Sequence, residues 1–150
     1  MGHTFANLLI HITFSTKERL PCIKGDVGPK LFAYMGGILR EKGATPLLVN
    51  GPADHVHLLM ILPPVQSLSD VMRVLKTNSS KWMHETWPDR AAFGWQEGYG
   101  AFAVSESMRA ALLEYIRNQE QHHRKMTFQE EFVSLLKKHG IEYDERYIWT

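Results

Sequence analysis

Two histidines separated by a single residue form the first pattern in this sequence that can do chemistry. They are His55 and His57, at the start of a segment that is otherwise apolar as far as Leu62. On a β-strand, residues i and i+2 project from the same face, so the two imidazoles lie side by side while Val56 points to the other face. Neighbouring neutral imidazoles can bind one divalent cation. The pattern indicates a candidate metal site, although an isolated pair of this kind is more often two partly exposed strand histidines.

A tyrosine and a glutamine one helical turn apart form the second pattern. Tyr115 and Gln119 are four residues apart in a segment with helical character, so they share one face. His122 and His123 follow about one turn later on the same side. A tyrosine hydroxyl can act as a nucleophile when an adjacent base or a metal activates it. Taken alone, these residues are more typical of an ordinary amphipathic helix.

Length and composition restrict the class of protein. The chain has 150 residues, 44% of them hydrophobic and 22% charged, so we expect one globular domain, residues 1–150. No apolar run approaches the roughly 20 residues needed to span a bilayer, and no signal peptide is recognised, so we expect a cytoplasmic location. A single cysteine, Cys22, excludes an internal disulfide. The net charge of +1 gives little support for nucleic-acid binding by the chain as a whole, so such binding requires a local basic patch.

Hydrophobic periodicity predicts alternating strands and helices. Strands are expected at 7–15, 45–50, 55–62 and 96–105, and helices at 26–42, from 67 to beyond 83, at 105–125 and at 127–140. Ser67 with Asp70, and Thr127 with Glu130, are spaced as helix N-terminal capping pairs. The order β-α-β-β-α-β followed by two helices predicts a ferredoxin-like α+β sandwich, with a helical layer on an antiparallel sheet.

Together, the two motifs resemble those of the single-tyrosine HUH transposases of the TnpA type, from the smallest bacterial insertion sequences, which are also found as repeat-associated tyrosine transposases. His55-Val56-His57 resembles their histidine–hydrophobic–histidine motif. The segment from Tyr115 to Gln119, followed by His122-His123-Arg124, resembles their nucleophile helix. Further similarity lies at 11–17, 79–82, 95–100 and 128–145, so the resemblance covers nearly the whole chain in order.

The resemblance implies that the protein cleaves and rejoins single-stranded DNA with hairpin ends through a covalent bond to Tyr115. It implies a divalent metal, Mg²⁺ or Mn²⁺, held by His55, His57 and Gln119. It also implies a homodimer in which the tyrosine helix of one subunit can complete the site of the other. A phosphotyrosine linkage keeps the energy of the phosphodiester, so rejoining needs no ATP, which agrees with the lack of a Walker-type glycine-rich loop. No residue is identified as the base that activates Tyr115.

Five basic residues are candidate contacts to DNA phosphates: Lys17 and Arg19 in the first loop, and Arg73, Lys76 and Lys81 on the second expected helix. Each is equally consistent with a solvated surface charge. Two other functions also stay open. One is a domesticated hairpin-binding or nucleic-acid-binding module without strand transfer, and the other is a small metal-dependent nuclease that activates water. A covalent protein–DNA adduct distinguishes a transposase from both.

Overall fold

A four-stranded antiparallel sheet forms the centre of the protein. The computed structural model describes residues 2–150. Its strands are β1 (Leu9–Ser15), β2 (Thr45–Asn50), β3 (His55–Ile61) and β4 (Gly100–Ala103), in the spatial order β2-β3-β1-β4. One helix connects β1 to β2 and another connects β3 to β4, which confirms the predicted ferredoxin-like order.

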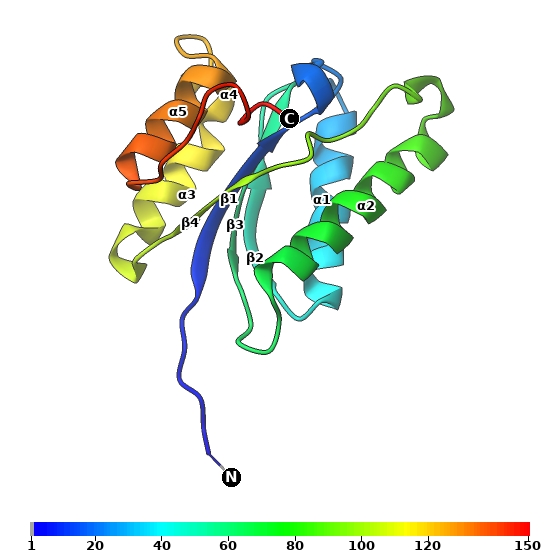
Figure 1. Ribbon diagram of the computed structural model, residues 1–150. Helices are drawn as coiled ribbons and strands as arrows, with labels where there is room; N and C mark the ends of the chain where they lie inside the picture. The colour runs from blue at the N-terminus through cyan, green and yellow to red at the C-terminus, as the bar shows by residue number, and fades with distance from the viewer. Residues whose placement is uncertain (1) are drawn as a thin grey trace.

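Helices α1 (Val27–Glu41) and α2 (Leu68–Thr86) cover one face of this sheet (Figure 1). Val56 and Leu58 of β3 point into this layer, as strand alternation requires, and are fully buried there. Ser67 caps α2, because its side-chain oxygen accepts a hydrogen bond from the backbone N–H of Asp70 at 3.1 Å. The main hydrophobic core therefore lies between these two helices and the sheet.

The C-terminal third of the chain covers the opposite face of the sheet. It forms α3 (Arg109–Arg117), α4 (Gln119–His122) and α5 (Phe128–Lys138) (Figure 1). Thr127 and Glu130 form the predicted capping box at the start of α5. The structure thus adds a second helical layer to the one that the sequence predicted, and the side chains of β1 and β3 are enclosed on both faces.

Two elements differ from their predicted bounds. The strand expected at 96–105 is reduced to β4, because the carbonyls of Gln96, Glu97 and Gly98 accept hydrogen bonds from the Lys76 ammonium at 2.7, 2.9 and 2.6 Å. The helix expected at 105–125 is not continuous. It begins as a 3-10 turn, η3 (Glu106–Met108), and is divided at Asn118, where φ is −97° and ψ is 24°.

Gly100 allows α5 to pack closely on β4. A Cβ atom at this position would lie 2.8 Å from the ring of Phe132 and 2.9 Å from that of Phe102, which is closer than real side chains approach. Phe102 and Phe132 belong to the hydrophobic cluster that attaches α5 to the sheet. Gly100 is therefore needed for the position of the second helical layer.

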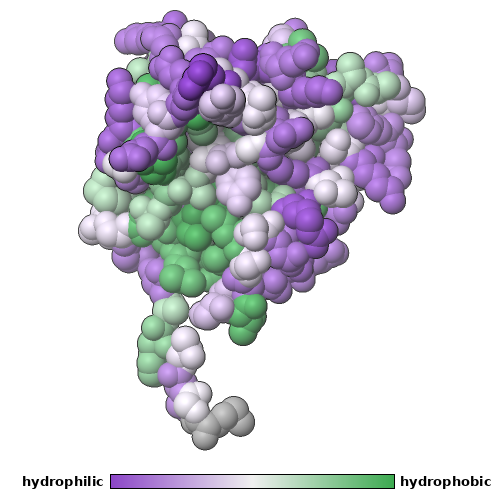
Figure 2. Space-filling model, in the orientation of Figure 1, coloured by the Kyte–Doolittle hydropathy of each residue, from purple (hydrophilic) through white to green (hydrophobic). Residues whose placement is uncertain are grey.

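The surface is largely hydrophilic in the view of Figure 2, and its largest hydrophobic area lies between the two helical layers, just above the N-terminal arm. Among residues 2–150, no helix is both long enough and apolar enough to cross a membrane.

Replacing Lys76 with methionine should destabilise the fold. The ammonium of Lys76 connects α2 to three carbonyls before β4, and it lies 5.0 Å from the centre of the Phe14 ring. Burial lowers the pKa of Lys76 to about 8. We expect Lys76→Met to lower the free energy of unfolding by about 2–3 kcal/mol, because three carbonyls lose a charged donor. Urea denaturation measures this change, and the exposed Lys81→Met should change stability by less than about 0.5 kcal/mol. Equal effects of the two substitutions would contradict this role of Lys76.

Candidate functional site

Three imidazoles and one carboxylate converge between the sheet and the second helical layer. They belong to His55 and His57 of β3, to His123 directly after α4, and to Glu131 of α5, and their ligand atoms all lie within 4.8 Å of one another. The Nε2 atoms of the three histidines lie 3.3, 2.8 and 3.1 Å, respectively, from Oε1 of Glu131. His55 and His57 are fully buried and Glu131 is 1% exposed, whereas His123 is only partly buried, so the cluster is largely enclosed and meets the surface at His123.

Each of the three imidazoles is fixed through its Nδ1 atom, so that Nε2 faces the cluster. The fixing contacts are His55 Nδ1 with Asp54 Oδ1 at 2.7 Å, His57 Nδ1 with His11 Nε2 at 2.8 Å, and His123 Nδ1 with the Met126 carbonyl at 2.7 Å. Hydrogen bonds of this type orient metal-ligating histidines and fix their tautomers. The cluster therefore has the outer contacts of a metal site as well as its donor atoms.

Glu131 connects this cluster to Tyr115. Its second oxygen, Oε2, accepts a hydrogen bond from the Tyr115 hydroxyl, which also lies 3.1 Å from Nε2 of His122. Burial and the negative charge of Glu131 raise the pKa of Tyr115. Burial alone would raise the pKa of Glu131, but the close imidazoles of His123, His55 and His57 hold it well below the usual range. The carboxylate is therefore ionised and the phenol protonated at neutral pH.

The pKa values of His55 and His57 in the cluster, and of His11 beside it, are shifted in different directions. Burial and the nearby His57 lower the pKa of His11 to about 3. Burial also lowers the pKa of His57, against the attraction of Glu131. For His55, burial opposes protonation, but the hydrogen bond with Asp54 and the nearby carboxylate of Glu131 outweigh it and raise its pKa. His57 and His11 are thus neutral near pH 7, which is the form in which imidazole binds a metal.

Several buried polar atoms at this site have no hydrogen-bond partner among residues 2–150. They are Nε2 of His55, Nε2 of His123 and Oε1 of Gln119. The two imidazole nitrogens are near Glu131 but lack hydrogen-bond geometry, while Gln119 is fully buried and uses only its Nε2, which donates to the Tyr115 carbonyl at 3.3 Å. Buried polar atoms are normally satisfied. The unpaired imidazole nitrogens of His55 and His123 beside the Glu131 carboxylate fit a divalent cation, so the cluster can bind a metal.

The structure brings some of the predicted site residues together and leaves others apart. His55, His57 and Tyr115 all contact Glu131, whereas Gln119 is buried one turn after Tyr115 and its side chain donates to the Tyr115 carbonyl. The five basic residues predicted to contact DNA do not gather there. Lys17 and Arg19 lie in the turn η1 (Lys17–Arg19), Arg73 pairs with Asp70 at 2.7 Å, Lys81 lies 3.9 Å from Glu85 on α2, and Lys76 is bound to three carbonyls.

Sequence reasoning did not identify Glu131 as part of the site. On α5 it lies within the apolar stripe formed by Phe128, Phe132 and Leu136, three residues after Phe128 and directly before Phe132. A carboxylate in such a stripe is buried, and a buried charge requires partners. That position was the signal available in the sequence. His123 lay close to the nucleophile motif, but its contact with the strand histidines depends on the turn after α4.

Comparison with known proteins places the chain among transposase sequences. Residues 4–119 match the family model described as "Transposase IS200 like". The chain is 29% identical to the ISDra2 transposase TnpA of Deinococcus radiodurans over 114 residues, which cover 73% of this chain and 81% of that protein. It is also 29% identical over 124 residues to the transposase for insertion sequence element IS200 of Salmonella typhimurium, covering 79% of this chain and 81% of that protein.

Solved structures with the same fold are also similar. A crystal structure of a protein from Deinococcus radiodurans R1, named as a candidate transposase, aligns with a TM-score of 0.65 at 26% identity and covers 79% of this chain and 96% of that one. A REP-associated tyrosine transposase bound to a REP hairpin aligns with a TM-score of 0.60 at 13% identity, covering 82% of this chain and 72% of that one. The second likeness concerns the fold alone.

His11 should act by positioning His57. We expect His11→Leu to weaken Mn²⁺ binding about 10–100-fold, because His57 loses the contact that orients its ring. His11→Gln, which keeps a hydrogen-bonding group, should recover part of the affinity. Isothermal titration calorimetry measures both, with His84→Ala as a control because His84 hydrogen-bonds to the Phe93 carbonyl, outside the cluster. Unchanged Mn²⁺ affinity in His11→Leu would exclude this positioning role.

Proposed function

This chain belongs to the IS200-like transposase family, and we propose that it cleaves and rejoins single-stranded DNA through a covalent bond to Tyr115. The observation that carries the proposal is the hydrogen bond from the Tyr115 hydroxyl to Glu131, whose other oxygen lies among three imidazoles. A nucleophile and a metal-binding cluster that share one carboxylate are adjacent. A phosphodiester bound beside one of them would therefore contact the other.

His55, His57 and Gln119 are the proposed metal ligands, and His123 and Glu131 offer two further donor atoms. The unpaired Nε2 of His55 and Oε1 of Gln119 support this assignment. An octahedral ion has six positions, so even five protein donors leave one for a phosphate oxygen. A divalent cation bound there would supply Lewis-acid polarisation of that oxygen. The imidazole donors favour Mn²⁺ over Mg²⁺, although availability also determines which ion binds.

The proposed reaction transfers a phosphoryl group to Tyr115. The tyrosine oxygen forms a bond to phosphorus while the bond from phosphorus to the departing 3′ oxygen breaks. The departing 3′ oxygen takes up a proton, which balances the one that Tyr115 loses, so the products are a phosphotyrosine on one DNA end and a free 3′ hydroxyl on the other. Because the Tyr115 hydroxyl donates to Oε2 of Glu131, its proton is directed toward that oxygen before attack. The new linkage retains the phosphodiester energy, and the reverse attack by a 3′ hydroxyl rejoins the strand.

The proposed substrate is single-stranded DNA with hairpin ends. The REP-associated transposase that shares this fold is bound to a REP hairpin, which supports a hairpin ligand here. A homodimer is also proposed, and the hydrophobic area in Figure 2 is a surface that a second subunit would cover. Tyr115 already lies beside Glu131 of its own chain, so exchange of helices between subunits is not needed for this contact.

Replacement of Tyr115 by phenylalanine should abolish the covalent adduct. With a labelled hairpin oligonucleotide and Mn²⁺, the unmodified protein should give a protein–DNA band that survives denaturing electrophoresis, and Tyr115→Phe should give none because the attacking oxygen is gone. Binding of the same oligonucleotide, measured in chelator, should remain. The matched control is Tyr34→Phe, since Tyr34 stacks on Trp82 on the other side of the sheet.

The same experiment separates the competing functions. Cleavage that yields free 5′-phosphate ends without an adduct would identify a nuclease that activates water. Binding without cleavage in the unmodified protein would identify a nucleic-acid-binding module. Adduct formation by Tyr115→Phe at the rate of the unmodified protein would show that another residue is the nucleophile.

A further inference from the structure

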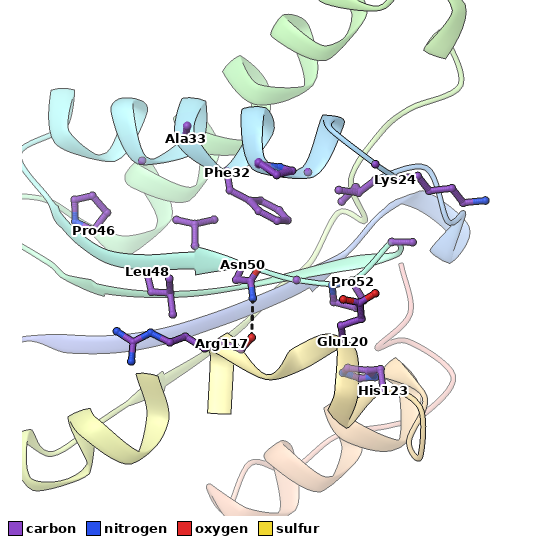
Figure 3. A pocket seen from close by; sticks show the side chains of 18 of the residues that line it. Lys24, Phe32, Ala33, Pro46, Leu48, Asn50, Pro52, Arg117, Glu120 and His123 are labelled. Carbon is purple, nitrogen blue, oxygen red and sulfur yellow. Dashed lines mark hydrogen bonds between the residues drawn. The ribbon is translucent and has the colours of Figure 1, made fainter. Parts of the chain in front are cut away.

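A groove runs along the free edge of the sheet, between α1 and the α3–α4 segment. It encloses about 1020 Å³, and strand β2 lies along it (Figure 3). In this view, Phe32 of α1 points toward β2, and Arg117, Glu120 and His123 line the opposite side. Asn50 fixes this opening at the end of β2, because its amide donates to the Ile116 and Arg117 carbonyls at 2.9 and 3.4 Å.

The charge of this groove differs from that of the rest of the protein. Four cationic side chains line it, Lys24, Arg40, Arg117 and Arg124, against one carboxylate, Glu120. This leaves an excess of three positive charges, whereas the whole chain has a net charge of +1. Within residues 2–150, Lys24, Arg40 and Arg124 form no ion pair, and Arg117 has only a 3.7 Å contact with the exposed Glu114. The groove therefore presents the local basic patch that the overall charge does not provide.

The groove leads to the cluster of Glu131 and the histidines. His123 lines the groove, and its ring also packs 4.3 Å from that of His55, centre to centre, with Nε2 3.1 Å from Glu131. Arg124 lines both this groove and the hollow on the other side of α4 that contains Tyr115 and His122. A chain of phosphates lying in the groove would thus reach the nucleophile past His123 and Arg124.

The sides of the groove combine these charges with apolar surface. Phe32 and Ala33 of α1 and Pro46 and Leu48 of β2 face the opening (Figure 3). Such a combination suits a single strand, whose phosphates contact cations while its unpaired bases contact apolar and aromatic side chains. A duplex stem offers phosphates on its outside but keeps its bases stacked inside.

We propose that this groove binds the single-stranded DNA segment next to the cleaved phosphate, with Lys24, Arg40, Arg117 and Arg124 contacting its backbone. The inference rests on the proposed function, because it names where the substrate of that same site lies. The proposed phosphate contacts lie before α1, on α1, at the end of α3 and after α4, and they differ from the residues predicted from sequence in the first loop and on α2.

The test is the salt dependence of binding to a fluorescein-labelled 20-residue oligodeoxythymidylate, followed by anisotropy in chelator so that no cleavage occurs. The logarithm of the binding constant falls as the logarithm of the salt concentration rises, and each lost phosphate contact to a single strand makes this negative slope shallower by about 0.7. The double variant Lys24→Gln/Arg40→Gln should therefore make the slope shallower by about 1.4 and weaken binding. The matched control, Lys30→Gln/Lys137→Gln, removes the same charge from exposed positions that do not line the groove, and should leave the slope unchanged.

Three results would overturn the proposal. One is an unchanged slope in the groove variant, and another is an equal loss in the control pair. The third is a groove variant that alters the sedimentation coefficient of the free protein, since that would show a second copy of the chain covering the groove. The adduct assay tests the proposed function separately. If the unmodified protein formed no Tyr115 linkage but the slope difference remained, the proposed function would be wrong while the groove would still bind single-stranded DNA.

Discussion

The convergence of three imidazoles on the Glu131 carboxylate is the interaction on which the rest of the site depends. A carboxylate that is 1% exposed is stable only with strong partners, and removal of one partner from a buried ionic group costs about 3–5 kcal/mol. His55 and His57 come from the sheet and Glu131 from α5, so this contact joins the sheet to the second helical layer. Tyr115 is held by the other oxygen of the same carboxylate. The position of the nucleophile and the attachment of α5 are consequently coupled.

The family membership and the geometry account for different parts of the function. The match over residues 4–119 includes both histidines of β3, Tyr115 and Gln119, but ends before Glu131. The connection of α5 to the site is therefore a property seen in this structure rather than in the matched segment. The same holds for His123, which contacts the cluster on one side and the basic groove on the other. Glu131 therefore joins the expected nucleophile to the histidines, and His123 joins the histidines to the groove proposed to bind the DNA strand.

Strand alternation and helical spacing predicted which side chains share a face, whereas the roles expected of those side chains came from the family resemblance. His55 and His57 share a face because of the two-residue period of β3, and Tyr115 and Gln119 are close although the helix is divided between them. The contribution of Glu131 depends on how α5 packs, which in turn needs Gly100 to have no side chain. Likewise, Lys76 fits the spacing of a surface cation on α2, and only the folded chain shows it bound to three carbonyls. Local periodicity can therefore show that Glu131 is buried, but it does not show which residues from other elements contact Glu131 or Lys76.

The central claim is that the groups around Glu131 form a binding site for one divalent cation. Anomalous diffraction from crystals soaked in MnCl₂ tests it most directly, because it locates manganese without reference to activity. The account predicts one strong peak among His55, His57, His123 and Glu131, about 2.0–2.3 Å from Nε2 of His55 and of His57. No peak at this position, with Mn²⁺ bound only to carboxylates on the surface, would contradict the account.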